Sequence, residues 1–326
     1  MHTLMVMIDD NTGKLYAAAK PIFPSVIDEI VPLESVNLKF VTHFHIEALW
    51  GDLSISYKEI FPEYLQKLVQ FIKPSPEERH PLCYDDQSCN KLRLEEATWI
   101  SRKLLSMRLP VSSLYLMIEE TKFEAALEEF LESAGSLSYI QIYSVVPLKH
   151  STVDALIDKF APVDRGGFTL SRSICLTKNQ LERLVFKCGM SDKEVGITVY
   201  PEGATDNSKV TDLFHFHKHY SIKTIGNKQL TATRGGSELE LHMTQLIGGS
   251  VMWMWERPYV ARARLNIDRH RDEGQASQDR DHETRQNEPK EVNRHIKRSI
   301  WDRLRGLALQ LRQLKYRRSE RHIDRW

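Results

Sequence analysis

Short runs that favour β-strand alternate with segments of helical period between residues 36 and 200, and this alternation limits the fold more than any other feature. The strand-like runs cover residues 36–41, 92–94, 114–118, 139–146, 168–174 and 195–200. Between them, apolar residues recur every three or four positions, as at Phe123, Leu127 and Phe130. That spacing places them on one face of a helix. The pattern predicts an α/β fold built from repeated strand–helix units.

The expected helix starts agree with this division. A hydroxyl residue stands three positions before a carboxylate or amide residue at Ser56, Thr121, Ser151 and Thr177. Such a pair can satisfy the first backbone N–H groups of a helix reciprocally. Each pair opens an apolar stripe of helical period, which supports four of the predicted helices.

The spacing of the units indicates how they stack. With strand starts at Lys91, Ser113, Tyr139, Phe168 and Glu194, the units repeat every 22 to 29 residues. A unit of this length buries its faces only against its neighbours, as in a solenoid. Strand–helix crossovers in a parallel sheet give the same signal. We favour an irregular strand–helix solenoid because the connections are short and no phosphate-binding glycine loop follows a strand.

The helical period disappears after residue 200. Alternating runs cover 210–217, 220–225, 229–233 and 238–243, with Gly226-Asn227 and Gly235-Gly236 between the later ones. Paired glycine and asparagine favour tight turns between antiparallel strands. We therefore predict a small antiparallel β cap at 210–245 that closes a body spanning 36–245.

Two features of this body resemble a known family. Leu137, Ile140 and Ile142 form the pattern L-x-x-I-x-I, which is similar to the strand half of a leucine-rich repeat. A strand–helix array that ends in a strand pair at 220–230 resembles the substrate-binding region of nematode-type F-box-associated proteins. The resemblance implies a non-enzymatic scaffold that recognises another protein.

The chain also departs from this family. Val145 stands where a leucine-rich repeat would carry asparagine or cysteine, and residues 1–31 show no F-box module. If the resemblance holds, the chain has the recognition half without the half that docks to a ubiquitin ligase.

Charge separates the chain into two parts. Residues 257–326 hold 19 basic and 11 acidic residues, a net charge of +8, whereas residues 1–256 carry a net charge of −7. We predict an N-terminal segment at 1–35, the body, a disordered linker at 246–290, a basic amphipathic helix at 291–318 and a tail at 319–326. Segments rich in charge and poor in apolar residues do not bury enough surface to fold.

The predicted C-terminal helix is a candidate binding element. Its apolar stripe runs from Ile296 to Leu314, and basic residues surround it, among them Arg298, Arg305 and Arg312. Such a helix can pack on the acidic body, pair with a second copy as a short coiled coil, fill a groove of a partner protein, or lie on an anionic membrane. Nucleic acid is less favoured, because no aromatic platform accompanies the basic residues.

Histidines at alternate positions are the sharpest local motif. His215, His217 and His219 would share one face of a strand, with Asp212 close in sequence. Imidazole is a common metal ligand, but a strand directs the three rings in parallel rather than toward one ion. A solvated polar face is favoured over a metal site, and the pair His43 and His45 has the same geometry.

Other chemical motifs are sparse. Cys83 and Cys89 are too far apart for a zinc pair, and Cys188 lies on an apolar helical stripe and is expected in the core. The sequence contains no G-x-S-x-G, P-loop or G-x-G-x-x-G motif. We expect no cofactor, and a small-molecule ligand is disfavoured.

Few cysteines and no apolar run of about 18 residues favour an intracellular protein, cytoplasmic or nuclear.

The functional hypothesis is a scaffold that binds another protein through the exposed side of its parallel strands. The contact positions would be Lys91, Arg93, Tyr115, Gln141 and Tyr143, which alternate with the apolar residues of their strands. Two alternatives stay open. One is a divergent α/β enzyme with a His/Asp site at 212–219, and the other is an electrostatic adaptor that acts through the C-terminal helix.

Overall fold

The computed structural model describes residues 1–22, 30–49, 51–72, 83–216 and 219–258. They belong to one compact unit, Met1–Arg264. The predicted linker beyond residue 258, the predicted helix at 291–318 and the tail at 319–326 lie outside the described residues.

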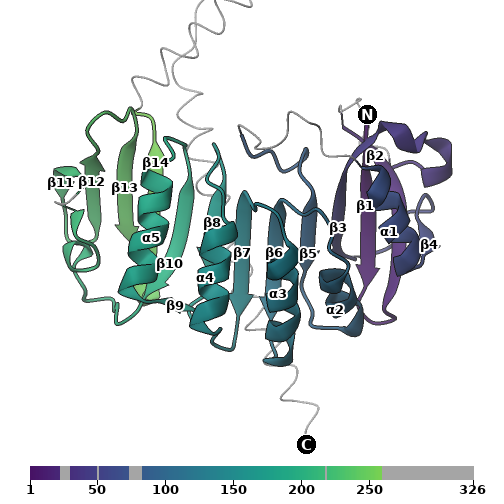
Figure 1. The fold of residues 1–326 in the computed structure, drawn as a ribbon, viewed down its shortest axis with the longest axis horizontal. Coiled ribbons are helices and arrows are strands. Elements are labelled where there is room, and N and C mark those ends of the chain that lie inside the picture. The colour runs from purple at the N-terminus through teal and green to yellow at the C-terminus, as the bar shows by residue number, and fades with distance from the viewer. Residues whose placement is uncertain (23–29, 50, 73–82, 217–218, 259–326) are drawn as a thin grey trace, which may run out of the picture. The chain divides into compact units, whose positions relative to one another are not determined.

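The described residues form a mixed α/β structure around a large sheet of 14 strands (Figure 1). The strands are β1 (His2–Asp9), β2 (Lys14–Pro21), β3 (Val41–Ala48), β4 (Lys58–Ile60), β5 (Lys91–Leu94), β6 (Ser113–Ile118), β7 (Tyr139–Ser144), β8 (Gly167–Leu170), β9 (Cys175–Leu176), β10 (Gly196–Pro201), β11 (Ser221–Ile225), β12 (Gln229–Thr233), β13 (Glu240–Gln245) and β14 (Val251–Glu256). The α/β class predicted from the sequence is confirmed.

Neighbouring strands in the middle of the sheet follow one another in chain order. β1, β3, β5, β6, β7, β8 and β10 lie side by side in that order, and each is parallel to the next. β2 and then β4 extend the sheet antiparallel beyond β1. At the other end, β14, β13, β12 and β11 continue antiparallel beyond β10, so that β14 lies between β10 and β13. The parallel part contains no reversal of strand order.

Five helices cover one face of this sheet (Figure 1). They are α1 (Pro62–Phe71), α2 (Trp99–Ser106), α3 (Lys122–Ser133), α4 (His150–Lys159) and α5 (Lys178–Gly189). The helices α2, α3, α4 and α5 pack side by side, each against the next. We call the side that carries them the helical face and the other side the open face.

Strict alternation of side chains explains why the two faces differ. In β6, Leu114, Leu116 and Ile118 point to the helical face and are at most 1% exposed, whereas Tyr115 and Met117 point the other way and are partly exposed. Successive strand residues lie on opposite faces, so a period of two places one set in the core. The predicted helical stripe meets this set, because Phe123, Leu127 and Phe130 of α3 are also buried.

Lysines join α4 to α3 and α5 to α4. Lys159, at the end of α4, donates from Nζ to the carbonyl oxygen of Ala134, 2.6 Å away, just after α3. Lys187, near the end of α5, donates to the carbonyl oxygens of Ile157 (2.9 Å) and Asp158 (2.8 Å) in the last turn of α4. Carbonyls at a helix C-terminus lack partners within the helix. The same device therefore recurs in consecutive units.

An asparagine ties together three consecutive parallel strands. The side-chain oxygen of Asn90, just before β5, accepts from the backbone N–H of Phe44 in β3 at 3.2 Å. Its side-chain nitrogen donates to the carbonyl of Pro110, ahead of β6, at 2.9 Å. One side chain thus links β3, the start of β5 and the loop before β6.

Aromatic packing builds the antiparallel end of the sheet. Trp253 of β14 is fully buried, stacks on Phe216 with ring centroids 5.6 Å apart, and meets Phe214 edge-on at 5.5 Å. The indole N–H of Trp255 donates to the hydroxyl of Tyr220 at 3.2 Å. Large aromatic side chains bury much apolar area, and these five hold β14 to the segment that precedes β11.

Two predicted strands are corrected by the structure. Residues 36–41 were expected to be extended, but 38–40 form a 3₁₀ turn and β3 begins at Val41. Residues 210–217 were expected to be the first strand of the β cap. Instead, Val210–Asp212 is a 3₁₀ turn, and Phe214 and Phe216 both turn into the aromatic cluster around Trp253. Tertiary packing of the two phenylalanines outweighs the local alternation.

The boundaries predicted at the ends of the body also change. The segment 1–35 supplies β1 and β2, which belong to the same sheet as the body. Part of the predicted linker, Val251–Glu256, is β14, in which Val251, Trp253 and Trp255 are buried in alternation. That alternation gives a central strand enough buried apolar surface to be ordered.

The predicted helix starts have three outcomes. Thr177 and Gln180 form the complete capping box at the start of α5. Thr121 precedes α3, but its side chain makes no capping hydrogen bond. Ser151 lies inside α4, and the pair that begins at Ser56 runs into β4, so these two predictions are wrong.

Candidate functional site

The five predicted contact residues all lie on the open face, on three adjacent strands. Lys91 and Arg93 belong to β5, Tyr115 to β6, and Gln141 and Tyr143 to β7. In the strand register Arg93 lies beside Tyr115, and Tyr115 beside Gln141. All five are partly exposed. The structure therefore brings them together, and their role in binding a partner stays a prediction.

Four of these side chains form a continuous patch that we call the aromatic row: Arg93, Tyr115, Gln141 and Tyr143. The Arg93 guanidinium lies over the Tyr115 ring, 4.5 Å from its centroid, and the Tyr115 and Tyr143 rings are 5.6 Å apart. The Gln141 amide nitrogen donates to the Tyr143 hydroxyl at 2.5 Å. Burial raises the pKa of Tyr115 to about 12, so the ring stays neutral. The row offers flat aromatic surface with one fixed cation, a combination common in recognition surfaces.

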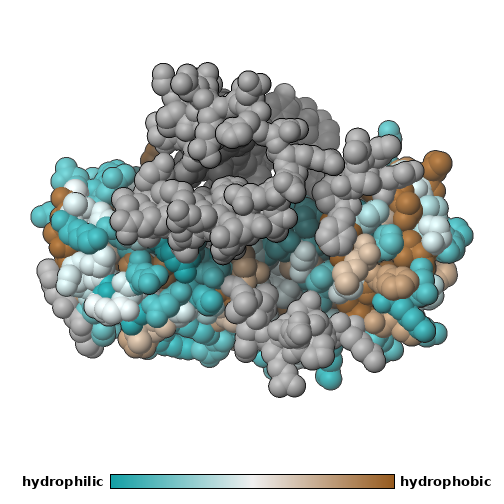
Figure 2. All heavy atoms as spheres, turned by 90° about the horizontal axis from the view of Figure 1, so that it is seen from above, coloured by the Kyte–Doolittle hydropathy of each residue, from teal (hydrophilic) through white to brown (hydrophobic). Residues whose placement is uncertain are grey.

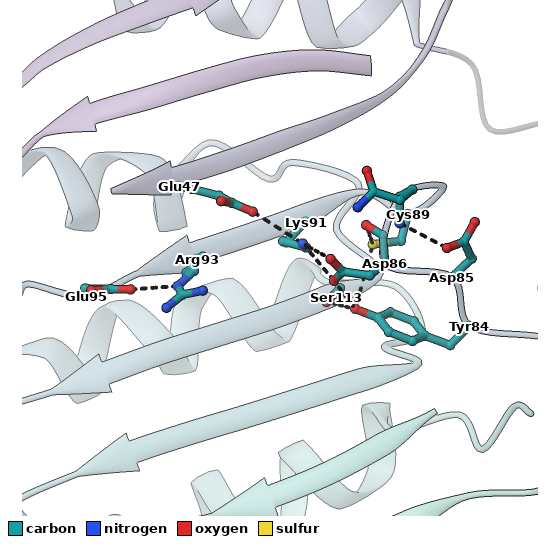
Figure 3. Close-up of polar contacts among 10 residues, drawn as sticks. Glu47, Tyr84, Asp85, Asp86, Cys89, Lys91, Arg93, Glu95 and Ser113 are labelled. Carbon is teal, nitrogen blue, oxygen red and sulfur yellow. Dashed lines mark hydrogen bonds and ion pairs between the residues drawn. The ribbon is translucent and has the colours of Figure 1, made fainter. Parts of the chain in front are cut away.

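A charged cluster adjoins the row along β5 (Figure 3). Nζ of Lys91 lies 3.3 Å from Oε1 of Glu47 and 2.7 Å from the Asp86 carboxylate. Burial opposes the charge on Lys91, but its hydrogen bond to Asp86 and the charge of Glu47 outweigh burial and raise its pKa. Further along the strand, Nε of Arg93 donates to Glu95 at 2.6 Å. Both cations of β5 are thus charged and fixed in position.

The segment before β5 places Asp86. The Tyr84 ring stacks on Tyr139 of β7, with centroids 4.8 Å apart, and its hydroxyl donates to Asp86 at 2.9 Å. The same hydroxyl lies 3.2 Å from Oγ of Ser113. The Cys89 thiol is buried next to this group, and burial raises its pKa to about 11. These contacts, most of which Figure 3 shows, fix the carboxylate that holds Lys91.

The charged cluster borders a polar recess of about 270 Å³ on the open face. It is lined from β1, β2, β3, β5 and the segment before β5, and we call it the polar recess. Its lining residues are Thr3, Met5, Lys20, Pro21, Ile22, His45, Glu47, Asp86, Gln87, Lys91 and Arg93. Most of them carry side chains that can hydrogen-bond.

His45 is a buried polar residue of the recess. It is 4% exposed, as Thr3 is, and no residue that the structure describes makes a hydrogen bond to its Nε2. Burial, with help from the nearby charge of Lys91, lowers its pKa to about 4. A neutral imidazole with one unmatched ring nitrogen therefore lies in the wall of the recess. Leaving a buried polar atom unpaired costs about 1–3 kcal/mol.

A second hollow, of about 350 Å³, is apolar and lies at the N-terminal end of the sheet. Leu33, Val36, Leu38, Ile60 and Phe61 contribute to its lining. Figure 2 shows hydrophobic residues gathered at this end of the molecule. Phe61 is 70% exposed, which leaves apolar surface open beside the hollow.

The predicted histidine motif does not form the expected ladder. His215 and His219 lie outside the strands, and His217 is not among the described residues. Nε2 of His215 is 2.8 Å from Nζ of Lys178, and the His219 ring meets Phe186 edge-on. Within the described ranges, no three His, Cys, Asp or Glu side chains are grouped to hold a metal ion.

Two further predictions can be placed. Cys188 is fully buried in α5, as its apolar stripe predicted. Arg298, Arg305 and Arg312 lie outside the described residues, and so does the segment at 291–318 on which the adaptor hypothesis depends. Among the helices described, none is long and apolar enough to cross a membrane.

The strand order also bears on what the site can do. In open α/β sheets, ligands of enzymes are bound at the carboxyl ends of the strands where the order reverses. The parallel strands described here show no reversal, and the polar recess lies near the amino ends of β1 and β5, beside Thr3 and Lys91. The arrangement is that of an extended surface into which the polar recess opens.

Sequence reasoning named Lys91 and Arg93 as contact residues but did not assign the other residues that build the recess. His45 and Glu47 lie two apart on β3, and both line the recess. The alternation of His43, His45 and Glu47 with the buried Phe44 and Ile46 was the signal available for a polar open face. Asp86 gave no such signal, because its position depends on stacking between residues far apart in the chain.

The chain matches no known family model, no curated protein and no solved structure.

Proposed function

We propose that this protein is a non-enzymatic scaffold that binds another protein through the open face of its sheet. The resemblance to the substrate-binding part of F-box-associated and leucine-rich-repeat proteins supports this role. In the same proposal, the parallel strands and their helices form an irregular solenoid, in which every unit adds one strand to the binding face.

The observation that carries the proposal is the aromatic row on the face opposite the described helices. Arg93, Tyr115, Gln141 and Tyr143 are held by contacts with one another or with Glu95, so little side-chain entropy is lost when a partner binds. Tyrosine and arginine are enriched among the residues that dominate protein interfaces.

Site-specific cross-linking in the full chain tests the proposal. A photoreactive phenylalanine analogue replaces Tyr143 on the open face or, as the matched control, Phe186, which is 50% exposed on α5. We expect one protein to be captured from position 143 and not from 186. Capture should fall strongly when Arg93→Ala is added. Capture from 186 alone, or capture from 143 that Arg93→Ala leaves unchanged, would overturn the proposal.

A further inference from the structure

We propose that the polar recess binds a carboxylate group, and that the bound group is an aspartate or glutamate side chain of the partner. The inference rests on the proposed function in one respect, namely that the carboxylate belongs to a protein. The recess adjoins the aromatic row, because Arg93 belongs to both. A partner that covers the row therefore passes the mouth of the recess.

Cationic side chains are fixed in the lining of the recess. Lys20, Lys91 and Arg93 line it together with the carboxylates of Glu47 and Asp86, and Arg93 is paired with Glu95 just outside the lining. Both carboxylates contact the same ammonium group, that of Lys91. A cationic ligand would have to displace Lys91 to reach these carboxylates, whereas an anionic ligand can contact the cationic side chains where they already lie.

Hydrogen bonding points to the same class of ligand. Lys91 is held in place with a side chain that is only 13% exposed, so its position is set before a ligand arrives. The Arg93 guanidinium donates from Nε to Glu95, and its two terminal nitrogens carry further N–H donors. In the tautomer that carries its proton on Nε2, the neutral His45 adds an N–H donor that no described residue satisfies. A carboxylate oxygen accepts from all three kinds of donor.

The size of the charge decides between a carboxylate and a phosphate. Glu47 and Asp86 stay inside the recess, and like charges repel strongly where water is partly excluded. A dianionic phosphate would feel this repulsion about twice as strongly as a monoanionic carboxylate. The lining therefore suits a single negative charge.

Binding of small probes to the full chain tests the recess without any partner. The probes are N-acetyl-glutamate methylamide, its glutamine counterpart, glutarate and inorganic phosphate, and the readout is the nitrogen and proton NMR shift of the His45 imidazole. We expect saturable shifts with the capped glutamate and about tenfold weaker binding of the capped glutamine, since one charged hydrogen bond is lost. Glutarate should bind like the capped glutamate, because the recess recognises the carboxylate.

Variants locate the binding. Lys91→Gln should abolish the shifts, and Lys20→Gln, on β2, should weaken binding several-fold. Lys122→Gln, on the exposed start of α3, is the matched control and should bind as the parent does. Equal binding of the glutamine probe, tighter binding of phosphate, or the same loss with Lys122→Gln would overturn the inference.

The outcomes of the two experiments are separable. If the capped glutamate binds the recess but position 143 captures no protein, the carboxylate site stands, while its assignment to a protein partner and the proposed function fail. If position 143 captures a partner but the probes give no saturable shift, the recess proposal fails and the scaffold proposal stands.

Discussion

The two faces of the same strands differ in what they demand of the sequence. On the helical face of β7, Ile140 and Ile142 are completely buried and meet the helices. On the open face of the same strand, Gln141 and Tyr143 are partly exposed and contact each other and Tyr115. One face is restricted to apolar residues that fit a packed layer, whereas the other accepts polar, aromatic and charged residues. Packing against the helices thus stabilises the fold from one side, while the proposed binding surface lies on the other.

The largest expected effect tests this difference on one strand. Ile142→Ala on the helical face should lower the free energy of unfolding by about 3 kcal/mol, because it removes buried methyl groups and leaves a cavity. Gln141→Ala, one residue away on the open face, should cost less than about 1 kcal/mol. Urea unfolding followed by circular dichroism measures both. Similar losses at the two positions would remove the distinction between the faces.

Lowering the pH should reduce the stability of the protein through His45 on the open face. Its pKa is lowered from 6.5 to about 4, chiefly by burial. Between these pH values the unfolded chain binds more protons, so this contribution to stability is complete above pH 6.5 and is lost as the pH falls toward about 4. His45→Gln should flatten the pH dependence by about 2 kcal/mol.

The measurement is urea unfolding at several pH values across this range. His150→Gln, an exposed change on α4, is the matched control. If the His45 variant keeps the acid slope of the parent protein, the buried neutral imidazole does not account for that slope.

On the helical face, the lysine contacts between helices should have a smaller effect. Lys187→Met removes two hydrogen bonds to the last turn of α4 while keeping most of the side-chain volume. We expect a loss of about 1 kcal/mol in thermal or urea unfolding. Lys122→Met, exposed at the start of α3, should change stability by less than about 0.5 kcal/mol. Equal losses for the two variants would mean that the lysine contacts between helices do not contribute to stability.

A gain in stability is expected at Asp10, next to the β1–β2 turn. Burial raises the pKa of its carboxyl from 3.8 to about 6, with the charges of Glu96 and Glu95 adding to the effect. The folded chain therefore binds more protons between these values, and stability falls as the pH rises through about 6. Asp10→Asn should stabilise the protein by about 1 kcal/mol at neutral pH, since the carboxylate is half-exposed and partly hydrated.

The pH dependence of this gain is its check. The difference between Asp10→Asn and the parent protein should shrink below about pH 6 and disappear near pH 4. The hydrogen bond from Thr98 can form with either residue. A constant gain at all pH values would point to a cause other than the charge.

Periodicity predicted the parts of the fold that depend on nearest neighbours. Strand residues such as Leu114 and Leu116 and helix residues such as Leu127 and Leu131 are buried as expected, because one repeating unit determines their environment. The short helix α2 was missed, although Thr98 caps it through the N–H of Ser101. Its eight residues give too little helical period to stand out.

The candidate site could be predicted only in part. The aromatic row follows from alternation within β5, β6 and β7, which a sequence displays directly. The polar recess depends on His45, which lies beside Lys91 through pairing of strands far apart in the chain, and on Asp86, which is placed by the stacking of Tyr84 on Tyr139. Which strands lie side by side determines such contacts, and the order of strands in a sheet cannot be predicted from a local sequence pattern.

The position of β14 has a consequence during synthesis. Since β14 lies between β10 and β13, the free edge of β10 stays uncovered on the ribosome until residues 251–256 have emerged. A bare parallel strand edge can pair with another chain. Premature termination between β10 and β14 would therefore yield a product that associates with its own copies, and the tryptophan-rich strand acts as the closing piece that prevents this.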